Sequence, residues 1–331
     1  MTQPGANEPT STNGNLRLPR ILTIVALSIL LVAALVGMDL LTLSRNNPAE
    51  ALGPHYYMAL GDSLSFGYQP NLDFSSGFAD DIFNTLHKAN VTAVVNYACA
   101  GETTTTMIQG GCVGRFAHHG SYTGPQLRAA VDFLKSANNY GRVSPITLEI
   151  GSNDVLPDWD ATTCSVRAGA NVDADLATMD ANLTQTILPQ LLDALNARTN
   201  ANNGDLHLLN YYNPYAKECP GSAPFVHEVN DHLAADAAKF RIPVVDVYAA
   251  FGGDNNTASH ICDYTWMCSQ FHDVHPTNTG YAVIAQAVET ALALPGGNPV
   301  PGILAPRSDV AGTIAALWRR PAGAAQSSNT I

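Results

Sequence analysis

Five short apolar runs, separated by longer segments of helical character, constrain the fold of this chain more than any other feature. The runs are apolar at nearly every position, which is typical of strands buried on both faces of a parallel sheet. The helical segments between them have the length that parallel crossovers require. The expected strands are 56–60, 93–97, 146–150, 206–211 and 242–247, and the expected helices are 77–88, 125–137, 175–199, 225–239 and 278–294.

This alternation predicts one α/β domain over residues 55–294, with a parallel sheet of five strands covered by helices on both faces. Pro189 lies inside the helical segment 175–199, so we expect that helix to be kinked or split there. Three connections, 101–124, 155–172 and 250–273, are longer than ordinary turns. Long ordered loops usually shape a functional site.

A second apolar feature precedes the domain. The 18 residues from Ile21 to Met38 carry no charge, and Arg17 and Arg20 flank them on the N-terminal side. A membrane span needs roughly 17–25 residues, and its basic flank stays in the cytoplasm. Residues 21–43 are therefore expected to be a transmembrane anchor or a signal peptide. The length of the run and the lack of an A-x-A site after it favour the anchor.

This segment sets the expected organisation of the rest of the chain. Residues 1–20 would form a disordered cytoplasmic N-terminus, and residues 44–54 a linker. The domain would then lie outside the cytoplasm, either membrane-anchored or secreted. After it, residues 295–331 are rich in Pro, Gly and Ala and are expected to be a tail outside the core.

Composition limits the partners. The chain has 16 basic and 28 acidic residues and a formal net charge of −12, so we expect no nucleic-acid partner. Apolar residues make up 46% and charged residues 13%, which indicates a buried core rather than disorder. There are six cysteines and no C-x-x-C, so a zinc site is not expected. In an exported chain, six cysteines indicate disulfides.

Two motifs place polar groups directly after predicted strands, at the edge of the sheet where doubly wound folds bind ligands. Ser63 follows the first strand in GDSLS, in the position of a nucleophile. A serine at such a junction is more often a helix N-cap. Asn153 follows the third strand in GSND, where its amide could donate to an oxyanion or form an Asx turn.

Two further motifs complete the group. Gly101, in ACAGETT after the second strand, either lets the backbone approach a ligand or is an ordinary turn glycine. His275, in DVHPT, precedes the last helix, and a base for a serine nucleophile is usually a histidine. The chain has ten histidines, so one of them alone carries little weight. The four motifs together are far more specific than any one of them.

In this combination and order, the four motifs make residues 55–294 resemble the GDSL or SGNH hydrolase family of esterases and lipases. The resemblance implies a three-layer α/β/α, flavodoxin-like fold, in agreement with the strand pattern, and no cofactor. It implies that Ser63 is the nucleophile and His275 the general base. It also implies an oxyanion hole formed by the backbone N–H groups of Ser63 and Gly101 and the side chain of Asn153.

The group that orients His275 stays open. The family usually has an aspartate three residues before the catalytic histidine, but that position here is His272, and Asp273 lies two before. In an extended segment, a shift of one residue turns a side chain to the opposite side, which argues against contact between Asp273 and the ring. The alternatives are the Asp273 carboxylate and the main-chain carbonyl of His272, because some secreted relatives use a carbonyl.

The resemblance to secreted bacterial lipases and esterases also implies three disulfides. Pairing neighbouring cysteines is one of the 15 possible connectivities. Each bridge would pin a loop that helps to position the site. The pairs would be Cys99–Cys112, Cys164–Cys219 and Cys262–Cys268.

Together these interpretations predict a serine esterase or lipase that acts as a monomer on small-molecule or lipid esters, with no cofactor and no metal. It would contact a membrane through residues 21–43 if that segment is not cleaved. A carbohydrate O-acetyl esterase of the same family is an alternative. A non-catalytic surface-binding module is another, favoured by the displaced aspartate and disfavoured by the four intact motifs.

Overall fold

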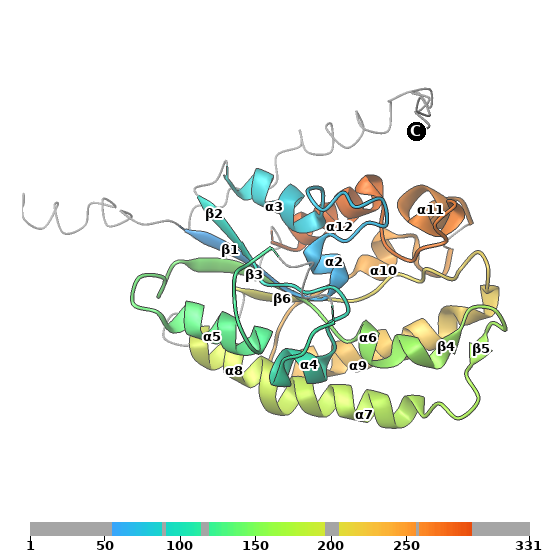
Figure 1. The fold of residues 1–331 in the computed structure, drawn as a ribbon, viewed down its shortest axis with the longest axis horizontal. Coiled ribbons are helices and arrows are strands. Elements are labelled where there is room, and N and C mark those ends of the chain that lie inside the picture. The colour runs from blue at the N-terminus through green and yellow to red at the C-terminus, as the bar shows by residue number, and fades with distance from the viewer. Residues whose placement is uncertain (1–54, 88–90, 114–118, 196–204, 256–257, 293–331) are drawn as a thin grey trace, which may run out of the picture. The chain divides into compact units, whose positions relative to one another are not determined.

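The computed structural model describes residues 55–87, 91–113, 119–195, 205–255 and 258–292. Five parallel strands form one sheet in the order β2-β1-β3-β6-β7 (Figure 1). In chain order this is 2-1-3-4-5, the flavodoxin-like arrangement, in which ligands bind where the strand order reverses, between β1 and β3. The strands are β1 (Tyr56–Gly61), β2 (Ala93–Asn96), β3 (Val143–Glu149), β6 (Leu206–Leu209) and β7 (Val244–Val245).

Helices cover the sheet on both sides (Figure 1). Helices α3 (Phe78–His87) and α12 (Asn278–Leu292) pack together on one face. Helices α5 (Gln126–Lys135), α8 (Leu188–Leu195) and α9 (Ala223–Lys239) lie on the other. The central strand β3 is buried along its whole length, because it has a paired strand on each side and helices above and below. The prediction of a three-layer α/β/α fold with a five-stranded parallel sheet is confirmed.

The helix expected over 175–199 differs from its prediction. It begins earlier, as α7 (Val172–Asn182), and passes through a π-helical turn, Leu183–Ile187, directly into α8. Pro189 lies in the first turn of α8, so the helix is irregular directly before the proline but is not split there. A π turn inserts one extra residue just before the proline, which displaces the carbonyl that the proline ring would otherwise meet.

The three long connections contain short elements that the sequence analysis treated as loops. Helix α4 (Thr104–Gln109) lies in the first, the two-residue strands β4 (Trp159–Asp160) and β5 (Ser165–Val166) in the second, and α11 (Ala258–Tyr264) in the third. Such elements are too short to carry a visible hydrophobic period. Helix α4 does have a local signal, since Thr103 and Thr106 form a capping box at its start.

Disulfides hold each of these connections. The six cysteines pair as Cys99–Cys112, Cys164–Cys219 and Cys262–Cys268, the pairing of neighbours proposed above. The first closes the loop that carries Gly101, the second ties the β4–β5 hairpin to the segment before α9, and the third closes the turn that precedes His275.

The predicted terminal segments, 1–20, 21–43, 44–54 and 295–331, lie outside the described residues. Over the ranges that are described, no helix combines the length and the apolarity needed to cross a membrane.

A buried histidine in the sheet should make the stability of the fold depend on pH. His207 in β6 is 2% exposed, and burial lowers its pKa to about 4, although Asp205 acts in the opposite direction. The unfolded chain takes up this proton below about pH 6.5, whereas the folded chain does not. Protonation of His207 in the unfolded chain therefore does not affect the free energy of unfolding above about pH 6.5, and it lowers that free energy as the pH falls towards 4.

We expect His207→Gln to relieve part of this acid sensitivity. The free energy of unfolding of the variant minus that of the unaltered protein should rise by on the order of 2 kcal/mol when the pH is lowered from 7 to 4. Urea denaturation at a series of pH values measures this difference. A difference that does not change with pH would contradict the assignment to His207.

Candidate active site

The way in which β1 ends leaves the hydroxyl of Ser63 available to a partner. Gly61 closes the strand with φ of 127°, and a side-chain carbon there would lie 1.7 Å from the carbonyl oxygen of Glu149. Helix α2 (Ser63–Phe66) begins two residues later. Its N-cap is Asp62, whose Oδ1 accepts a hydrogen bond of 2.9 Å from the Leu64 N–H. Because the aspartate takes the capping role that a serine often fills, the Ser63 hydroxyl is left for another partner.

That partner is His275. The Ser63 Oγ lies 2.7 Å from His275 Nε2, although 212 positions separate the two residues in the sequence. On the other side of the ring, Nδ1 lies 2.6 Å from Asp273 Oδ1. The Tyr68 ring packs against the imidazole, with ring centres 4.6 Å apart. These contacts form a continuous chain of hydrogen bonds from a hydroxyl through an imidazole to a carboxylate, as serine nucleophiles require.

Asp273 reaches the imidazole because the backbone before His275 is not extended. His272 has φ of 45°, in the left-handed region, and Asp273 Oδ1 also accepts a 2.9 Å bond from the His275 backbone N–H. An Asx turn of this kind folds the carboxylate back over the residues that follow it. Of the two alternatives for the group that orients His275, the Asp273 carboxylate is the one in contact with the ring, because this segment is not extended. Nδ1 faces the carboxylate rather than the carbonyl of His272.

The charge state of Asp273 suits this position. Burial by itself raises the pKa of the carboxyl, but the hydrogen bonds and the attraction of His275 outweigh burial and bring the pKa below its usual value. Asp273 is therefore ionised at neutral pH. An ionised carboxylate fixes the imidazole tautomer that accepts a proton at Nε2 and stabilises the imidazolium that then forms.

Gly101 and Asn153 lie at the same place as Ser63 and His275. All four line one cavity of about 520 Å³. Gly101 has φ of 82°, a conformation that favours glycine. Asn153 comes from the short helix α6 (Ser152–Val155), directly after β3, and its Nδ2 donates a 3.0 Å bond to the carbonyl of Glu102. An amide nitrogen has two hydrogens, so a second N–H is available to a ligand.

Most of the cavity wall is apolar. The polar groups include Ser63, Asn153, Asp273 and His275, and aliphatic and aromatic side chains from α2, α6, α9 and the segment after β6 form much of the remainder. A pocket with a few convergent polar groups and an apolar wall binds a ligand that is itself apolar except at one point. The apolar wall includes Leu64, Val155, Leu156, Tyr212, Pro214, Tyr215, Phe225, Val226 and Val229.

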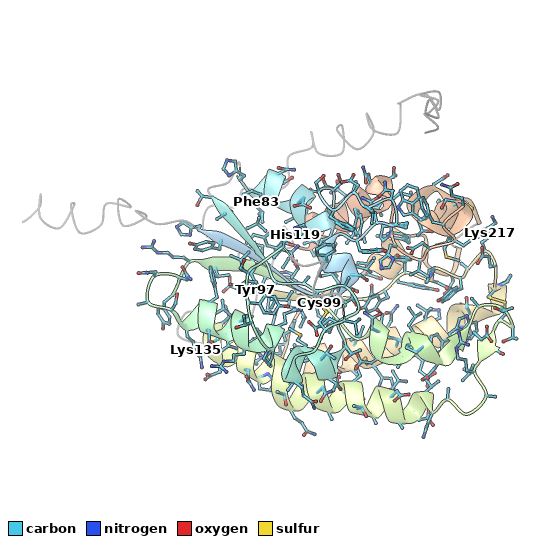
Figure 2. The ribbon with its side chains drawn as sticks, in the orientation of Figure 1. Phe83, Tyr97, Cys99, His119, Lys135 and Lys217 are labelled. Carbon is cyan, nitrogen blue, oxygen red and sulfur yellow. A yellow bond between two sulfur atoms is a disulfide. The ribbon has the colours of Figure 1, made fainter. Side chains whose placement is uncertain are left out.

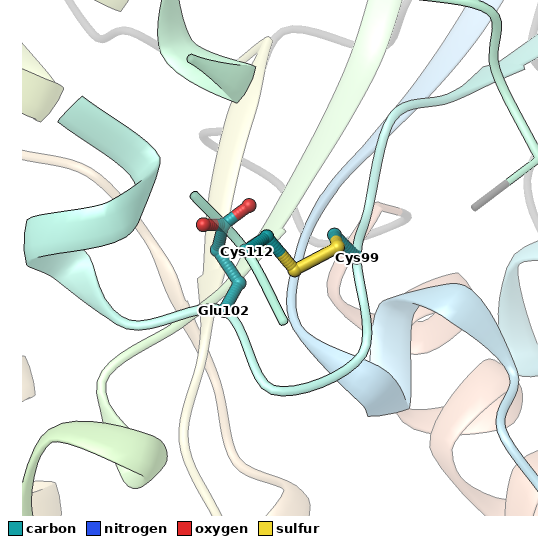
Figure 3. Close-up of side chains that lie close together, drawn as sticks. All are labelled: Cys99, Glu102 and Cys112. Carbon is teal, nitrogen blue, oxygen red and sulfur yellow. A yellow bond between two sulfur atoms is a disulfide. The ribbon is translucent and has the colours of Figure 1, made fainter. Parts of the chain in front are cut away.

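The disulfide in the Gly101 loop lies beside a buried carboxyl group. Cys99 lies near the ends of the strands (Figure 2), and the sulfurs of Cys99 and Cys112 and a carboxyl oxygen of Glu102 all lie within 4.8 Å of one another (Figure 3). Metal binding by cysteine requires a thiolate, and both sulfurs here are joined in a disulfide. The group therefore does not supply a metal-ligand set.

Sequence reasoning missed three buried or partly buried polar residues beside the site. Asp154 accepts hydrogen bonds from the backbone N–H and the hydroxyl of Thr104, which joins α6 to the start of α4. Glu102 and Gln126 are each 1% exposed and hydrogen-bonded to each other. Asp154 is part of the GSND motif and could have been noticed. Glu102 lies inside a motif that was read only for its glycine, and Gln126 looks like the first polar residue of an ordinary amphipathic helix.

Comparisons with known proteins give one family match. The model of a family described as GDSL-like Lipase/Acylhydrolase matches residues 57–288. A search of curated proteins found no match.

Several solved structures are similar in fold. The acetylxylan esterase Axe2 from Geobacillus stearothermophilus is 15% identical, with a TM-score of 0.47, over 74% of this chain and 97% of that one. An extracellular lipase from Streptomyces rimosus is 22% identical, with a TM-score of 0.44, over 72% and 99%. A lipolytic protein of the G-D-S-L family from Veillonella parvula is 16% identical, with a TM-score of 0.40, over 70% and 95%.

Proposed function

The chain belongs to the GDSL-like lipase/acylhydrolase family, and from this premise we propose that it is a serine esterase that cleaves carboxylic esters with apolar acyl chains. One observation carries the proposal: the hydrogen-bonded chain Ser63–His275–Asp273 lies at the polar end of an apolar cavity. A hydroxyl in such a chain is an activated nucleophile. The family itself is one of hydrolases that act on esters.

In the first half of the proposed reaction, the Ser63 Oγ attacks the ester carbonyl carbon while His275 Nε2 takes the hydroxyl proton. The carbonyl oxygen becomes an oxyanion, which the N–H groups of Ser63, Gly101 and Asn153 stabilise. The bond between the carbonyl carbon and the alkoxy oxygen then breaks. The alcohol leaves with the proton from His275, and the acyl group stays on Ser63 as an ester.

The second half reverses these roles with water. His275 Nε2 takes a proton from a water molecule, whose oxygen attacks the acyl carbon and forms a second oxyanion in the same place. The bond to Ser63 Oγ breaks, the serine recovers its proton from His275, and a carboxylic acid leaves. Asp273 stays ionised throughout and balances the positive charge that His275 carries in both halves.

The cavity wall favours a longer acyl chain over an acetyl group. Burying apolar surface contributes roughly 25 cal/mol per Å², so affinity rises with each methylene that covers the wall. An acetyl group would leave most of an apolar cavity of about 520 Å³ uncovered. For this reason we propose a fatty acyl ester as the substrate rather than a sugar acetate.

The three disulfides support a location outside the cytoplasm, since such bonds persist in oxidising compartments. We therefore propose that the enzyme meets its substrate outside the cytoplasm, either secreted or held at a membrane by residues 21–43.

Two measurements on the full-length protein test the proposal. A fluorophosphonate should label the protein at Ser63, as located by mass spectrometry of peptides. A series of p-nitrophenyl esters from acetate to palmitate should be hydrolysed with kcat/KM that rises beyond acetate. Labelling elsewhere, or no turnover of any ester, would overturn the assignment, and a sharp preference for acetate would favour the O-acetyl esterase.

The acyl chain is predicted to lie against α9. Val226 lines the cavity and is 6% exposed, so Val226→Phe should fill part of the space that a long chain needs. We expect kcat/KM for p-nitrophenyl octanoate to fall about 10-fold or more, and that for the acetate to stay within about 3-fold. Ala235→Phe, at an exposed position of the same helix, is the control. Equal effects on both esters would place the acyl chain elsewhere.

A further inference from the structure

We infer that Glu102 and Gln126 are positioning residues that hold the three segments of the proposed oxyanion hole in one fixed arrangement. The inference rests on the proposed function, because the three segments are those of Ser63, Gly101 and Asn153. Neither residue lines the cavity of the site, so both would act through other groups.

Gln126 holds the segment that leads into Ser63. It is the first residue of α5, and its side-chain amide binds both backbone groups of Gly61. The Gly61 N–H donates to Oε1 at 2.7 Å, and Nε2 donates to the Gly61 carbonyl at 2.9 Å. The same carbonyl also accepts a 3.0 Å bond from the N–H of Cys99, which precedes Gly101. Gln126 therefore holds the end of β1 at the point where the Gly101 loop crosses it.

Glu102 connects the segments of Gly101 and Asn153 to Gln126. Its carboxyl Oε2 accepts a 2.8 Å bond from Gln126 Nε2, and its main-chain carbonyl accepts the 3.0 Å bond from Asn153 Nδ2. Glu102 is also the residue next to Gly101. A single residue thus contacts the proposed amide donor, adjoins the proposed backbone donor, and reaches the serine segment through Gln126.

The chemistry of the Gln126 amide leaves it one orientation. Its two N–H groups face acceptors, the Gly61 carbonyl and the Glu102 carboxyl, while its oxygen faces an N–H donor. Turning the amide over would oppose donor to donor and acceptor to acceptor. Both residues are 1% exposed, so a hydrogen bond lost from the network is costly to leave unmade. The network is therefore specific and rigid.

Rigidity at this place has a catalytic consequence. An oxyanion hole works when its donors already point to the position of the developing charge. A displacement of about 1 Å in such groups can cost about 100-fold in rate. Loss of the network should therefore lower kcat more than it raises KM, because the acyl chain contacts the apolar wall and not these residues.

The test compares kcat and KM for p-nitrophenyl octanoate in variants of the full-length protein. Gln126→Glu keeps the shape of the side chain, but it replaces two N–H donors with a carboxyl group, which has at most one proton for the two acceptors, Glu102 and the Gly61 carbonyl. We expect its kcat to fall about 30-fold or more with KM within about 3-fold. The inhibition constant of an alkylboronic acid, which forms a tetrahedral adduct with serine, should rise in parallel. Gln190→Glu, on the exposed side of α8, is the matched control.

The exchange of both side chains provides the decisive comparison. In the double variant Gln126→Glu/Glu102→Gln, the amide at 102 can donate to the carboxylate at 126, so the bond between them returns with its direction reversed. We expect the double variant to regain at least about 5-fold of the lost kcat. A kcat of Gln126→Glu within about 3-fold of the unaltered protein, or no recovery in the double variant, would overturn the inference.

A second pair of variants covers the case in which Gln126→Glu does not fold. Glu102→Gln can still accept from Gln126, whereas Glu102→Ala cannot, so alanine should lower kcat about 30-fold and glutamine about 3-fold or less. Equal losses would overturn the inference. Turnover that depends on Ser63 in the unaltered protein separates this result from failure of the function itself. Without such turnover, the proposed function and the inference with it would both be wrong.

Discussion

Replacement of Ser63 by alanine is expected to lower kcat/KM for p-nitrophenyl octanoate by at least about 10⁴-fold. The variant loses the only protein atom that forms a covalent bond to the acyl group in the proposed mechanism. His275 and the oxyanion hole would remain, and they give at most a weak residual rate through bound water.

The fold should tolerate this change. Ser63 is the first residue of α2, but the helix is capped by Asp62, so alanine removes no cap. Circular dichroism and the Tm of the variant should therefore match those of the unaltered protein within a few degrees. Fluorophosphonate labelling should disappear together with the activity.

Ser65→Ala is the matched control for this experiment. Ser65 lies in the same short helix, is fully buried, and its Oγ has no hydrogen-bond partner among the described residues. We expect Ser65→Ala to keep activity within about 3-fold. If Ser63→Ala kept more than about 1% of the activity, Ser63 would not be the nucleophile.

The second large effect is expected for Asp273→Asn. Asparagine is nearly the same shape, and its oxygen can still accept the His275 backbone N–H. It carries no charge, however, and its amide N–H₂ can turn towards Nδ1 and stabilise the tautomer that cannot accept a proton at Nε2. We expect kcat/KM to fall about 10²- to 10⁴-fold.

This experiment decides between the two orienting groups that the sequence left open. If the carbonyl of His272 oriented the imidazole, Asp273→Asn would change kcat/KM by less than about 10-fold, since the carbonyl would be untouched. Asp263→Asn is the control, because Asp263 is exposed and lies in the same region of the chain. A loss of similar size in both variants would point to a general effect of charge rather than to the imidazole.

Two parts of the structure show why sequence reasoning succeeded for the sheet. The runs that form β1 and β3 are apolar because both faces of a central parallel strand are buried. A short run that is apolar at nearly every position is compatible with few other structures. The same runs mark where each strand ends, so the residues after them were placed at the carboxyl edge. Ser63 and Asn153 were placed at this edge for this reason, and the roles proposed for them came from the resemblance to a known family. The edge strand β7 is shorter than expected, Val244–Val245 instead of 242–247.

Asp273 shows where that reasoning left two alternatives open. Strand geometry over 272–275 argued against contact with His275, but the left-handed backbone of His272 and the bond from the His275 N–H to Asp273 turn the chain instead. A local periodicity rule cannot anticipate one residue with positive φ, since such a conformation is stabilised by contacts with the rest of the fold.

By itself, the sequence determined the α/β class and the strands, because these follow from local patterns of burial and residue type. The motif residues of the candidate site and the pairing of neighbouring cysteines came from the resemblance to a known family. The tertiary structure alone decided which group faces His275, how the chain passes Pro189, and that Gln126 and Glu102 bind to the segments around Ser63. Gln126 contacts Gly61 across 65 positions of sequence, and Ser63 contacts His275 across 212. Contacts over such separations depend on how the layers pack, and no local pattern in one sequence records them.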